Sequence, residues 1–231
     1  MRTPLVDCPP WKRGLDLAVV LATAPVTLPV VLVSSIIARA ETGESGLYRQ
    51  ERVGRGGRTF TIFKIRTMLP GAERGGPVTI RDDPRITRSG RVFRRLKIDE
   101  LPQLWNVLRG DMTLVGPRPD VPGFADRLEG DDRLVLSVRP GLTGPASLAF
   151  RDEETLLASV PDPARFNARV LFPAKIRLNR TYVEERSLLR DLRLLLETLV
   201  PPLGRRHVRA GRALLASLSN DGAPRHREDG E

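Results

Sequence analysis

Cysteine and histidine are almost absent from this sequence of 231 residues, which contains one cysteine and two histidines. Cys8 alone cannot form an intrachain disulfide, and it lies outside any metal-binding spacing, so the composition is typical of a reducing compartment. His207 and His226 both lie near the C-terminus. The sequence therefore argues against a histidine-based zinc site and against a histidine-dependent catalytic triad.

Aromatic residues are also scarce, at 5% of the chain. Surfaces that bind single-stranded nucleic acid interleave aromatic with basic side chains, and no known reader motif is present, so we expect no nucleic acid partner. The common nucleotide-binding loops are missing too. The stretch GRGG at residues 54–57 lacks the spacing of a Walker loop or of a dinucleotide fingerprint.

Positive charge is abundant. Lysine and arginine total 38 against 28 acidic residues, which gives a formal net charge of +10. The expected partners are therefore anionic, such as phosphates, nucleotides or acidic lipid headgroups, and charge alone does not choose among them. The length suits one functional unit with a membrane element and a tail, and two full-sized domains would be crowded.

One long apolar run, LDLAVVLATAPVTLPVVLVSSIIA at residues 15–38, carries a single charge at Asp16. As a helix it is long enough to cross a bilayer core of about 30 Å. A cleaved signal peptide, a spanning helix and a hairpin that enters and leaves on one face all remain interpretations. The run exceeds the roughly 7 to 15 apolar residues of a signal peptide, and the chain lacks paired cysteines, so the first interpretation is disfavoured.

Charge and proline bear on the choice between span and hairpin. A single span shows a cytoplasmic excess of basic residues on one side only, whereas basic residues flank both ends of this run. They are Lys12, Arg13, Arg39, Arg49, Arg52 and Arg55. Pro25 and Pro29 each remove a backbone donor in mid-run and predict a bend, where the hydroxyls of Thr23 and Thr27 could satisfy freed carbonyls. From the residues alone, a kinked span and a hairpin stay open.

The rest of the chain predicts a mainly helical α+β fold with a small β element. Glycines at residues 54–57 separate two extended stretches, the second a strand over residues 59–65. A helix is expected to begin near Asp83-Pro84. Its residues 86–96 alternate apolar and basic side chains, which suits either an anionic membrane surface or a solvated face over a core. Four residues then follow at helical spacing and are predicted to be core, namely Leu101, Leu104, Trp105 and Leu108.

The C-terminal third predicts helix followed by tail. Residues 174–199 are rich in leucine, arginine and glutamate, and should form one long or two shorter helices that stop at Pro201-Pro202. From residue 219 onward the sequence is polar, so we expect it to be disordered.

An acidic pair, Asp99-Glu100, is the candidate for chemistry. Adjacent acidic residues commonly begin helices, and by itself this pair could be no more than such a cap. Its surroundings favour phosphate chemistry instead, because arginine forks match phosphate oxygens and a carboxylate can attack phosphorus. A hard cation such as Mg²⁺ would complete the set. The nearby basic residues are Lys64, Arg66, Arg94, Arg118 and Arg139.

Several segments of the sequence resemble the motifs of a known protein family, which residue spacing alone does not reveal. The run KIDELPQLWNVLRGDMTLVGPRPD at residues 97–120 resembles the signature of the bacterial sugar transferase family, the small monotopic phosphoglycosyl transferases. Further segments follow the expected order and extend the likeness over most of residues 12–199. They are WKRGLDL at 11–17, RQERVGRGGRTFTIFKIRTM at 49–68, DDPRITRSGRVFRRL at 82–96 and RPGLTG at 139–144.

The resemblance implies a reaction. Asp99 would be the nucleophile toward the sugar-side phosphorus of a UDP-sugar, releasing UMP, and Glu100 would assist, with Mg²⁺ bound at both carboxylates. A polyprenyl phosphate, commonly undecaprenyl phosphate, would then take the phospho-sugar, which begins a surface polysaccharide or glycoconjugate. Substrate contacts are implied for residues that match basic or neighbouring motif positions, namely Lys64, Arg66, Thr67, Arg94, Arg118 and Arg139.

The resemblance also implies an architecture at the cytoplasmic face of the inner membrane, beside anionic lipids. Residues 1–14 would be a cytoplasmic segment, 15–38 a re-entrant hairpin broken at Pro25 and Pro29, 39–200 the cytosolic catalytic domain with interfacial amphipathic helices, and 201–231 a basic, disordered tail. Whether the chain forms a homo-oligomer is left open.

Two departures from the family pattern concern the bend and the sugar. Leu28-Pro29 stands where the family often has Ser-Pro, and Pro145-Ala146-Ser147 replaces a familiar Trp-Ala-Gln, so the sugar stays unassigned. Two rival functions remain, a non-catalytic basic membrane adaptor and a lipid-directed glycosyltransferase that releases UDP. An adaptor would give no function to the acidic pair or to the arginines near it.

Overall fold

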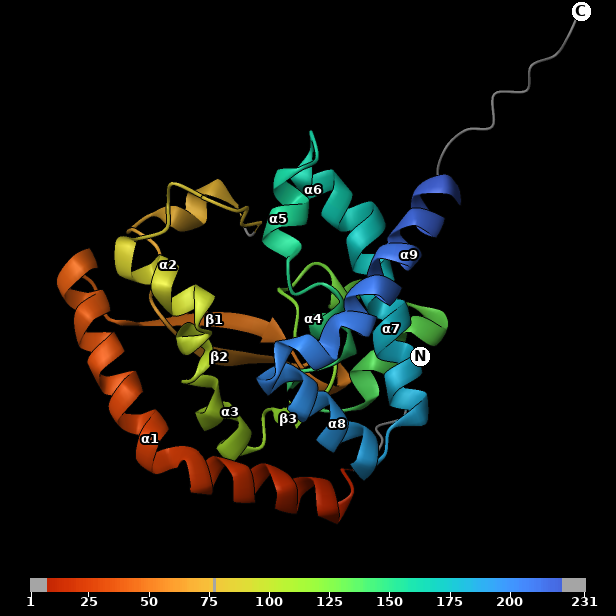
Figure 1. The fold of residues 1–231 in the computed structure, drawn as a ribbon, viewed down its shortest axis with the longest axis horizontal. Coiled ribbons are helices and arrows are strands. Elements are labelled where there is room, and N and C mark those ends of the chain that lie inside the picture. The colour runs from red at the N-terminus through yellow and green to blue at the C-terminus, as the bar shows by residue number, and fades with distance from the viewer. Residues whose placement is uncertain (1–7, 77, 222–231) are drawn as a thin grey trace, which may run out of the picture.

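The first element is a long helix, α1, Pro10–Thr42. The structure is a computed structural model that describes residues 8–76 and 78–221. Pro10 occupies the first helical position, where its missing N–H costs nothing, and the helix ends at Gly43, whose left-handed backbone (φ 73°) suits glycine. Figure 1 shows α1 as two arms that meet at a bend along the outside of the molecule. By length and composition, it is the single helix of the described residues that could cross a membrane.

The bend of α1 has a local cause in sequence. Pro25 and Pro29 lie inside the helix and are exposed, and each removes an amide donor from the ladder. The Thr23 hydroxyl donates to the Val19 carbonyl at 2.8 Å, a type of bond that itself bends helices. Pro25 has no N–H, so it is the Leu21 carbonyl that loses its helical hydrogen bond, and Thr23 bonds to a different carbonyl. Thr23 thus adds to the bend without replacing the bond that proline removes.

The larger sheet pairs β1, Leu47–Val53, with β2, Thr59–Ile65, in an antiparallel hairpin. Leu47 lies opposite Ile65 and Val53 opposite Thr59. The connecting 3-10 turn, Arg55–Gly57, has positive φ at Gly56 and Gly57, a conformation that glycine adopts without steric cost. The predicted strand over residues 59–65 and the glycine turn before it are confirmed.

Helix α2, Arg88–Arg95, begins later than predicted. The start expected near Asp83-Pro84 is wrong, because Asp83 accepts hydrogen bonds from Arg85 and so stabilises a loop. The N-cap is Thr87, whose hydroxyl oxygen accepts from the Gly90 amide at 3.0 Å.

Helix α3, Gln103–Arg109, leads into the second sheet, where β3, Thr113–Val115, runs parallel to β4, Gly141–Thr143. Leu104 and Leu108 pack against the core as predicted, but Trp105 is 55% exposed, so its assignment to the core is wrong. A Cβ at Gly141 would lie 2.1 Å from the Gly116 nitrogen, so glycine is required where these two segments cross.

Helices make up the C-terminal part of the molecule. The short helices α4 (Pro145–Ala149), α5 (Glu153–Ala158) and α6 (Pro163–Phe166) are followed by a π turn at Asn167–Leu171. The leucine-rich region forms two helices, α7 (Phe172–Glu185) and α8 (Leu188–Leu199), which confirms the shorter-helix alternative. The remaining 3-10 turns are Ala72–Gly75, Ile98–Glu100, Ala125–Arg127, Gly130–Ser137 and Pro201–Gly204.

Helix α9, Arg205–Asp221, corrects the predicted disordered tail over residues 201–231. Its buried Gly211 and Leu215 lie four residues apart on one face, and Gly211 packs against Ala149 and Phe150 of the α4 region. An absent side chain at position 211 lets the two segments approach closely, which composition does not predict. Residues 222–231 lie outside the described residues.

The main core joins the first arm of α1 to both sheets and the C-terminal helices. Val20 of α1 packs in one cluster with Met112, Leu114, Tyr182 and Leu194. The mainly helical fold with small β elements is thereby confirmed. The re-entrant path of α1 and the placement of helices at a membrane surface stay predictions.

Candidate active site

The acidic pair lies on the 3-10 turn Ile98–Glu100, between α2 and α3. Lys97, directly before it, has φ 58°, a left-handed conformation that side chains other than glycine adopt at a cost on the order of 1 kcal/mol. The 3-10 turn that follows Lys97 carries Asp99 into the interior, where it is 7% exposed. The strained backbone conformation therefore lies at Lys97, two residues before Asp99.

Asp99 is a buried carboxylate with an unused oxygen. Its Oδ1 is buried and has no hydrogen-bond partner among the described residues. Burial, and after it the Glu100 carboxylate, raises the pKa of Asp99 to about 6, while Lys64, Lys97 and Arg94 act in the opposite direction. At neutral pH this group is thus an ionised carboxylate with little stabilisation from neighbouring donors.

Glu100, unlike Asp99, has a hydrogen-bond partner for each of its carboxylate oxygens. Both of its oxygens accept from the Arg118 guanidinium, with Arg118 Nη1 3.1 Å from Oε2. Burial alone would raise the pKa of Glu100, but Arg118 lowers it to about 2. Arg118 also donates to the Leu142 carbonyl at 3.3 Å, which ties the pair to β4. Two adjacent carboxyl groups with pKa values pushed apart are a common arrangement in active sites.

Lys64 on β2 is the fourth predicted residue that the fold brings near the acidic pair. Burial, and after it repulsion from Arg52 and Arg118, lowers the pKa of Lys64 to about 7, while Glu100 and Asp99 favour its charge. Lys64 therefore lies within electrostatic range of the acidic pair.

Two further predicted residues, Arg66 and Thr67, follow directly after β2. Arg66 donates to the Ser45 carbonyl at 2.8 Å and pairs with Glu44 at 2.8 Å. Thr67 is buried, and its carbonyl accepts from the Thr87 amide at 3.0 Å, next to the start of α2. Their observed contacts stabilise the connection between α1 and α2.

Arg94 and Arg139 lie in different surroundings. Arg94 pairs with Glu154 of α5 at 3.3 Å and still contributes positive charge at Asp99. Arg139 instead lines a pocket with Lys12 and Tyr182 on the side where α1 begins. Of the predicted basic residues, Lys64, Arg94 and Arg118 are thus those grouped around the acidic pair.

Sequence analysis missed Arg52 as a member of this group. Burial first, and Arg118 second, lower the pKa of Arg52 to about 10, while Asp120 and Glu100 favour its charge. Its Nη1 donates to the Pro119 carbonyl at 3.2 Å. Alternation along β1 places Arg52 on one face with Tyr48 and Gln50, and this pattern could have singled it out.

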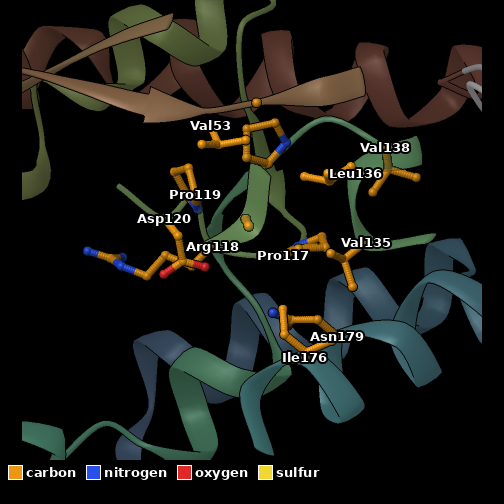
Figure 2. A pocket seen from close by; sticks show the side chains of 13 residues that line it. Val53, Pro117, Arg118, Pro119, Asp120, Val135, Leu136, Val138, Ile176 and Asn179 are labelled. Carbon is orange, nitrogen blue, oxygen red and sulfur yellow. The ribbon is translucent and has the colours of Figure 1, made fainter. Parts of the chain in front are cut away.

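Arg118 also lines a pocket beside the acidic pair. Figure 2 shows Pro117, Arg118, Pro119 and Asp120 on one side of this pocket, facing α7, which contributes Ile176 and Asn179. Burial raises the pKa of Asp120, and the Oδ1 of buried Asn179 has no hydrogen-bond partner within the described ranges. The pocket therefore combines apolar walls with a few polar groups next to the candidate catalytic carboxylates.

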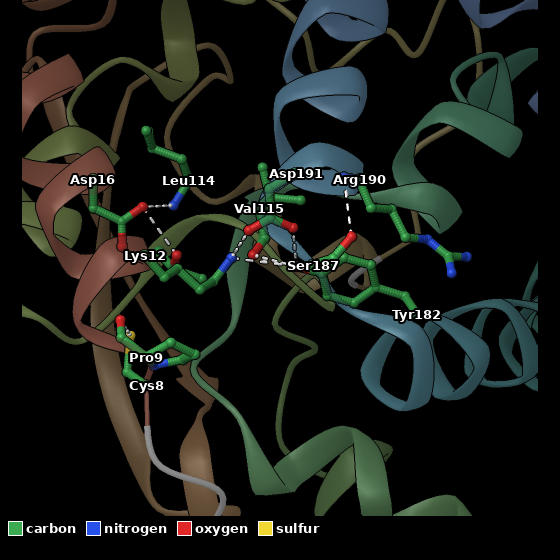
Figure 3. Close-up of polar contacts among 11 residues, drawn as sticks. Cys8, Pro9, Lys12, Asp16, Leu114, Val115, Tyr182, Ser187, Arg190 and Asp191 are labelled. Atoms are coloured by element: carbon green, nitrogen blue, oxygen red, sulfur yellow. Dashed lines mark hydrogen bonds and ion pairs between the residues drawn. The ribbon is translucent and has the colours of Figure 1, made fainter.

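A buried polar network attaches α1 to this region (Figure 3). Asp16 Oδ1 accepts from the Leu114 amide at 2.9 Å and from the Thr113 hydroxyl at 3.0 Å, both on β3. Lys12 forms an ion pair with Asp191 of α8. The Tyr182 hydroxyl lies 2.7 Å from Asp191 Oδ1. The single charge inside the apolar run is thereby explained as an anchor.

A metal ion would find two carboxylates here rather than a complete cage. Among residues 8–76 and 78–221, no group of three or more His, Cys, Asp or Glu side chains is arranged to hold an ion. The unpartnered, buried Asp99 Oδ1 is nevertheless suited to a cation, and each Glu100 oxygen keeps a lone pair beyond its bond to Arg118. Such a donor set fits Mg²⁺, which commonly takes one or two carboxylates together with substrate phosphates.

Comparison with known proteins identifies the family. The model of the family described as bacterial sugar transferase matches residues 9–204. The chain belongs to the bacterial sugar transferase family. This match includes α1, the acidic pair and α8, and it confirms the predicted family. Together with relatives that are named sugar-1-phosphate transferases, it confirms the predicted kind of enzyme, a sugar-phosphate transferase.

Three relatives of this bacterial sugar transferase differ in length. The UDP-glucose:undecaprenyl-phosphate glucose-1-phosphate transferase of Caulobacter vibrioides is 36% identical over 198 residues, which cover 83% of this chain and 69% of that protein. The exopolysaccharide production protein ExoY of Sinorhizobium fredii is 30% identical over 81% of this chain and 83% of its own. The UDP-N-acetylgalactosamine-undecaprenyl-phosphate N-acetylgalactosaminephosphotransferase of Aeromonas hydrophila is 39% identical over 58% of this chain, but only 32% of its own length is matched.

Proposed function

We propose that this bacterial sugar transferase moves a sugar 1-phosphate from a UDP-sugar to a polyprenyl phosphate at a membrane and releases UMP. The observation that carries the proposal is the buried Asp99 carboxylate, with a free oxygen, beside the Glu100–Arg118 pair. The names of the relatives support the same general reaction, since two of them are undecaprenyl-phosphate sugar-1-phosphate transferases. Their sugars differ, so the sugar of this chain is left unassigned.

In the first step, an Asp99 oxygen attacks the sugar-side phosphorus of the UDP-sugar. The bond between this phosphorus and the bridging oxygen breaks, and UMP leaves with the electron pair. Asp99 then carries the phospho-sugar as an acyl phosphate. Because Asp99 lies in a weakly solvated place, its ionised form is more reactive than an exposed carboxylate, provided that nearby cations screen the anionic substrate.

In the second step, a phosphate oxygen of the lipid attacks the same phosphorus. The bond between this phosphorus and the Asp99 oxygen breaks, the carboxylate leaves with the electron pair, and the lipid diphospho-sugar is released. Both steps need positive charge near the phosphorus oxygens, which Lys64, Arg94 and Arg118 would supply; their electrostatic proximity to the acidic pair supports this role. Arg118 also keeps Glu100 ionised and oriented toward the reacting group.

We further propose that Asp99 and Glu100 hold Mg²⁺ together with the substrate diphosphate. When bound, the ion would neutralise charge on the leaving UMP. Membrane attachment through α1 would place the site at the cytoplasmic face of the inner membrane, where the lipid phosphate lies.

The test is the mass of the intact protein after mixing with UDP-sugars in the absence of lipid acceptor. Wild type should gain the mass of a phospho-sugar and release UMP, whereas Asp99→Asn should do neither while still binding nucleotide. Asp82→Asn is the matched control, because the Asp82 side chain is 87% exposed and pairs with its neighbour Arg81, and it should behave as wild type. Full turnover by Asp99→Asn, or release of UDP, would refute covalent catalysis at this residue.

A further inference from the structure

Arg52 lies on the inner face of β1. Half-buried residues alternate along this strand with exposed ones, and Tyr48, Gln50 and Arg52 make up the half-buried set. Tyr48 is paired with Lys64 of β2, and residues directly opposite each other in an antiparallel pair point to the same side. Arg52 therefore shares its face of the hairpin with Lys64, one of the cations grouped around the acidic pair.

The Arg52 guanidinium is bound along both of its edges. Its Nε and Nη2 donate to Gln50 Oε1 at 3.2 and 2.6 Å, and its Nη1 donates to the Pro119 carbonyl at 3.2 Å. Because a guanidinium is planar and its N–H groups have fixed directions, the bonds to Gln50 set the direction of the bond to Pro119. Gln50 and Arg52 thus act as one unit directed at this carbonyl.

Two consecutive residues of β1 hold the segment that follows Arg118. Arg52 bonds to the carbonyl of Pro119, and the Val53 amide donates to the carbonyl of Asp120 at 2.8 Å. Figure 2 shows Val53 beside this segment. Pro119 also fixes its own φ angle, which removes freedom between the two bonds. The backbone directly after Arg118 is therefore attached to β1, while the Arg118 side chain reaches the acidic pair.

The charge of Arg52 is costly at this place. Burial first, and the Arg118 charge second, lower the pKa of Arg52, and repulsion from Arg52 in turn contributes to the lowered pKa of Lys64. A neutral side chain such as glutamine could donate a hydrogen bond to the Pro119 carbonyl without this repulsion. Groups whose charge is disfavoured in this way concentrate at functional sites. The charge of Arg52 and its bonds on two sides together indicate a role in the reaction.

We infer that Arg52 is a positioning residue of the transfer reaction. Oriented by Gln50, it fixes the backbone after Arg118 and so keeps the Arg118 fork on Glu100. The inference rests on the proposed function, in which Arg118 orients Glu100 and neutralises the phosphorus oxygens. It assigns to Arg52 no contact with the substrate, in contrast to Lys64. A shift of the segment by about 1 Å would misplace the fork, and such a misplacement can cost on the order of 100-fold in rate.

The experiment compares variants of the full chain. Arg52→Lys keeps the positive charge, but its ammonium lacks the planar fork that bonds on two sides. Gln50→Leu removes the acceptor without changing any charge, and a double variant combines both changes. Arg49→Lys is the matched control, because Arg49 is exposed and lies on the opposite face of β1. Thermal unfolding checks that every variant is folded.

Nucleotide release is measured with undecaprenyl phosphate, Mg²⁺ and whichever of UDP-glucose, UDP-galactose and UDP-N-acetylgalactosamine wild type uses fastest. Arg52→Lys and Gln50→Leu should each lower kcat about 10- to 100-fold while KM for the donor changes little, because the lost interaction acts only when Arg118 meets the reacting phosphorus. The double variant should be no slower than the slower single variant, because both changes break the same contact. Arg49→Lys should match wild type.

A raised KM with unchanged kcat in Arg52→Lys would overturn the inference and identify Arg52 as a substrate contact. A wild-type kcat in Gln50→Leu, or multiplied effects in the double variant, would show that the two residues do not act as one unit and would also overturn it. Release of UDP instead of UMP by wild type would remove the proposed function. A loss of kcat shared by Arg52→Lys and Gln50→Leu would in that case still support the placement of Arg118 by Arg52.

Discussion

Asp99 and Glu100 are adjacent residues with opposite environments. Asp99 is buried without a counter-ion of its own, and its pKa rises to about 6, whereas the Arg118 fork lowers the pKa of Glu100 to about 2. The arrangement leaves one carboxylate reactive and makes the other a fixed charge that orients Arg118. A single arginine therefore differentiates two side chains that sequence alone treats as equivalent.

Removing the charge at Asp99 should stabilise the protein at neutral pH. The folded-state pKa of about 6 exceeds the ordinary value of 3.8, so the unfolded chain loses this proton at lower pH than the folded chain. Ionisation thus opposes folding increasingly as pH rises from about 4 through 6. Asp99→Asn should raise the free energy of unfolding by on the order of 1 to 3 kcal/mol at pH 7.5 in EDTA.

Thermal unfolding at several pH values measures this effect. The gain from Asp99→Asn should shrink toward zero at about pH 3, below the ordinary pKa of 3.8, where Asp99 is protonated in both states. The exposed Asp82→Asn should change stability little at any pH. A lower melting temperature for Asp99→Asn at pH 7.5 would contradict a strained carboxylate at this position.

At the scale of elements, α1 combines a bend with an anchor. Its two prolines lie on the exposed side, while Lys12, Asp16 and Val20 face the domain at a spacing of four residues. Helical spacing of these three residues places them on one stripe of the first arm. The first arm is therefore fixed to the protein, and the region beyond the prolines is more exposed.

The proposed hairpin predicts that both ends of α1 share one side of the membrane. Cysteines introduced at Thr3 and Ser45 on a Cys8→Ser background should react equally with a membrane-impermeant reagent from the cytoplasmic side. Neither should react from outside intact cells, because basic residues flank both ends of the run. Labelling of only one position from outside would mean that α1 spans the bilayer.

Helical periodicity predicted elements better than it predicted burial. Leu104, Trp105 and Leu108 do lie on one helix, α3, yet Trp105 is exposed while both leucines pack against the core. The spacing of apolar residues predicts which of them share a helix face, but not how much of that face is buried in a helix of seven residues. The π turn before α7 and the helix α9 were likewise not indicated by local pattern.

At the scale of the molecule, the Lys12–Asp191 pair joins residues 179 positions apart. Both side chains are buried, and Tyr182 donates a hydrogen bond to the same carboxylate. Loss of one member leaves an uncompensated charge inside the protein. Lys12→Met alone should therefore lower the free energy of unfolding by about 3 to 5 kcal/mol.

A double-mutant cycle measured by thermal unfolding in detergent tests this pair. Lys12→Met with Asp191→Asn should cost clearly less than the sum of the two single changes, because the unpaired charge is gone. Asp111→Asn, which removes the partly exposed pair with Arg109, should cost at most about 1 kcal/mol. Additive effects of the first two changes would show that the pair is not coupled.

Secondary structure and motifs that depend on neighbouring residues could be predicted from the sequence. Contacts between segments far apart in the chain could not. The strand at residues 59–65 and the stop at Pro201-Pro202 follow from local rules. The acidic pair was found by its motif. Arg52 was missed because its place near Glu100 depends on the β1–β2 register and on the path of the loop through Pro119. Arg139 was assigned to the site because it matches a basic motif position, whereas in the fold it lines a pocket with Lys12.

The attachment of Asp16 to β3 has a geometric consequence. Asp16 bonds to Leu114, and four residues later Arg118 holds Glu100. If α1 lies in the bilayer as proposed, the depth of its first arm fixes the height of the carboxylates above the membrane plane. The phosphate of a lipid acceptor must then meet Asp99 at that height. Bilayer thickness and curvature would therefore alter the rate of transfer to lipid, and leave the formation of the phospho-sugar adduct unchanged.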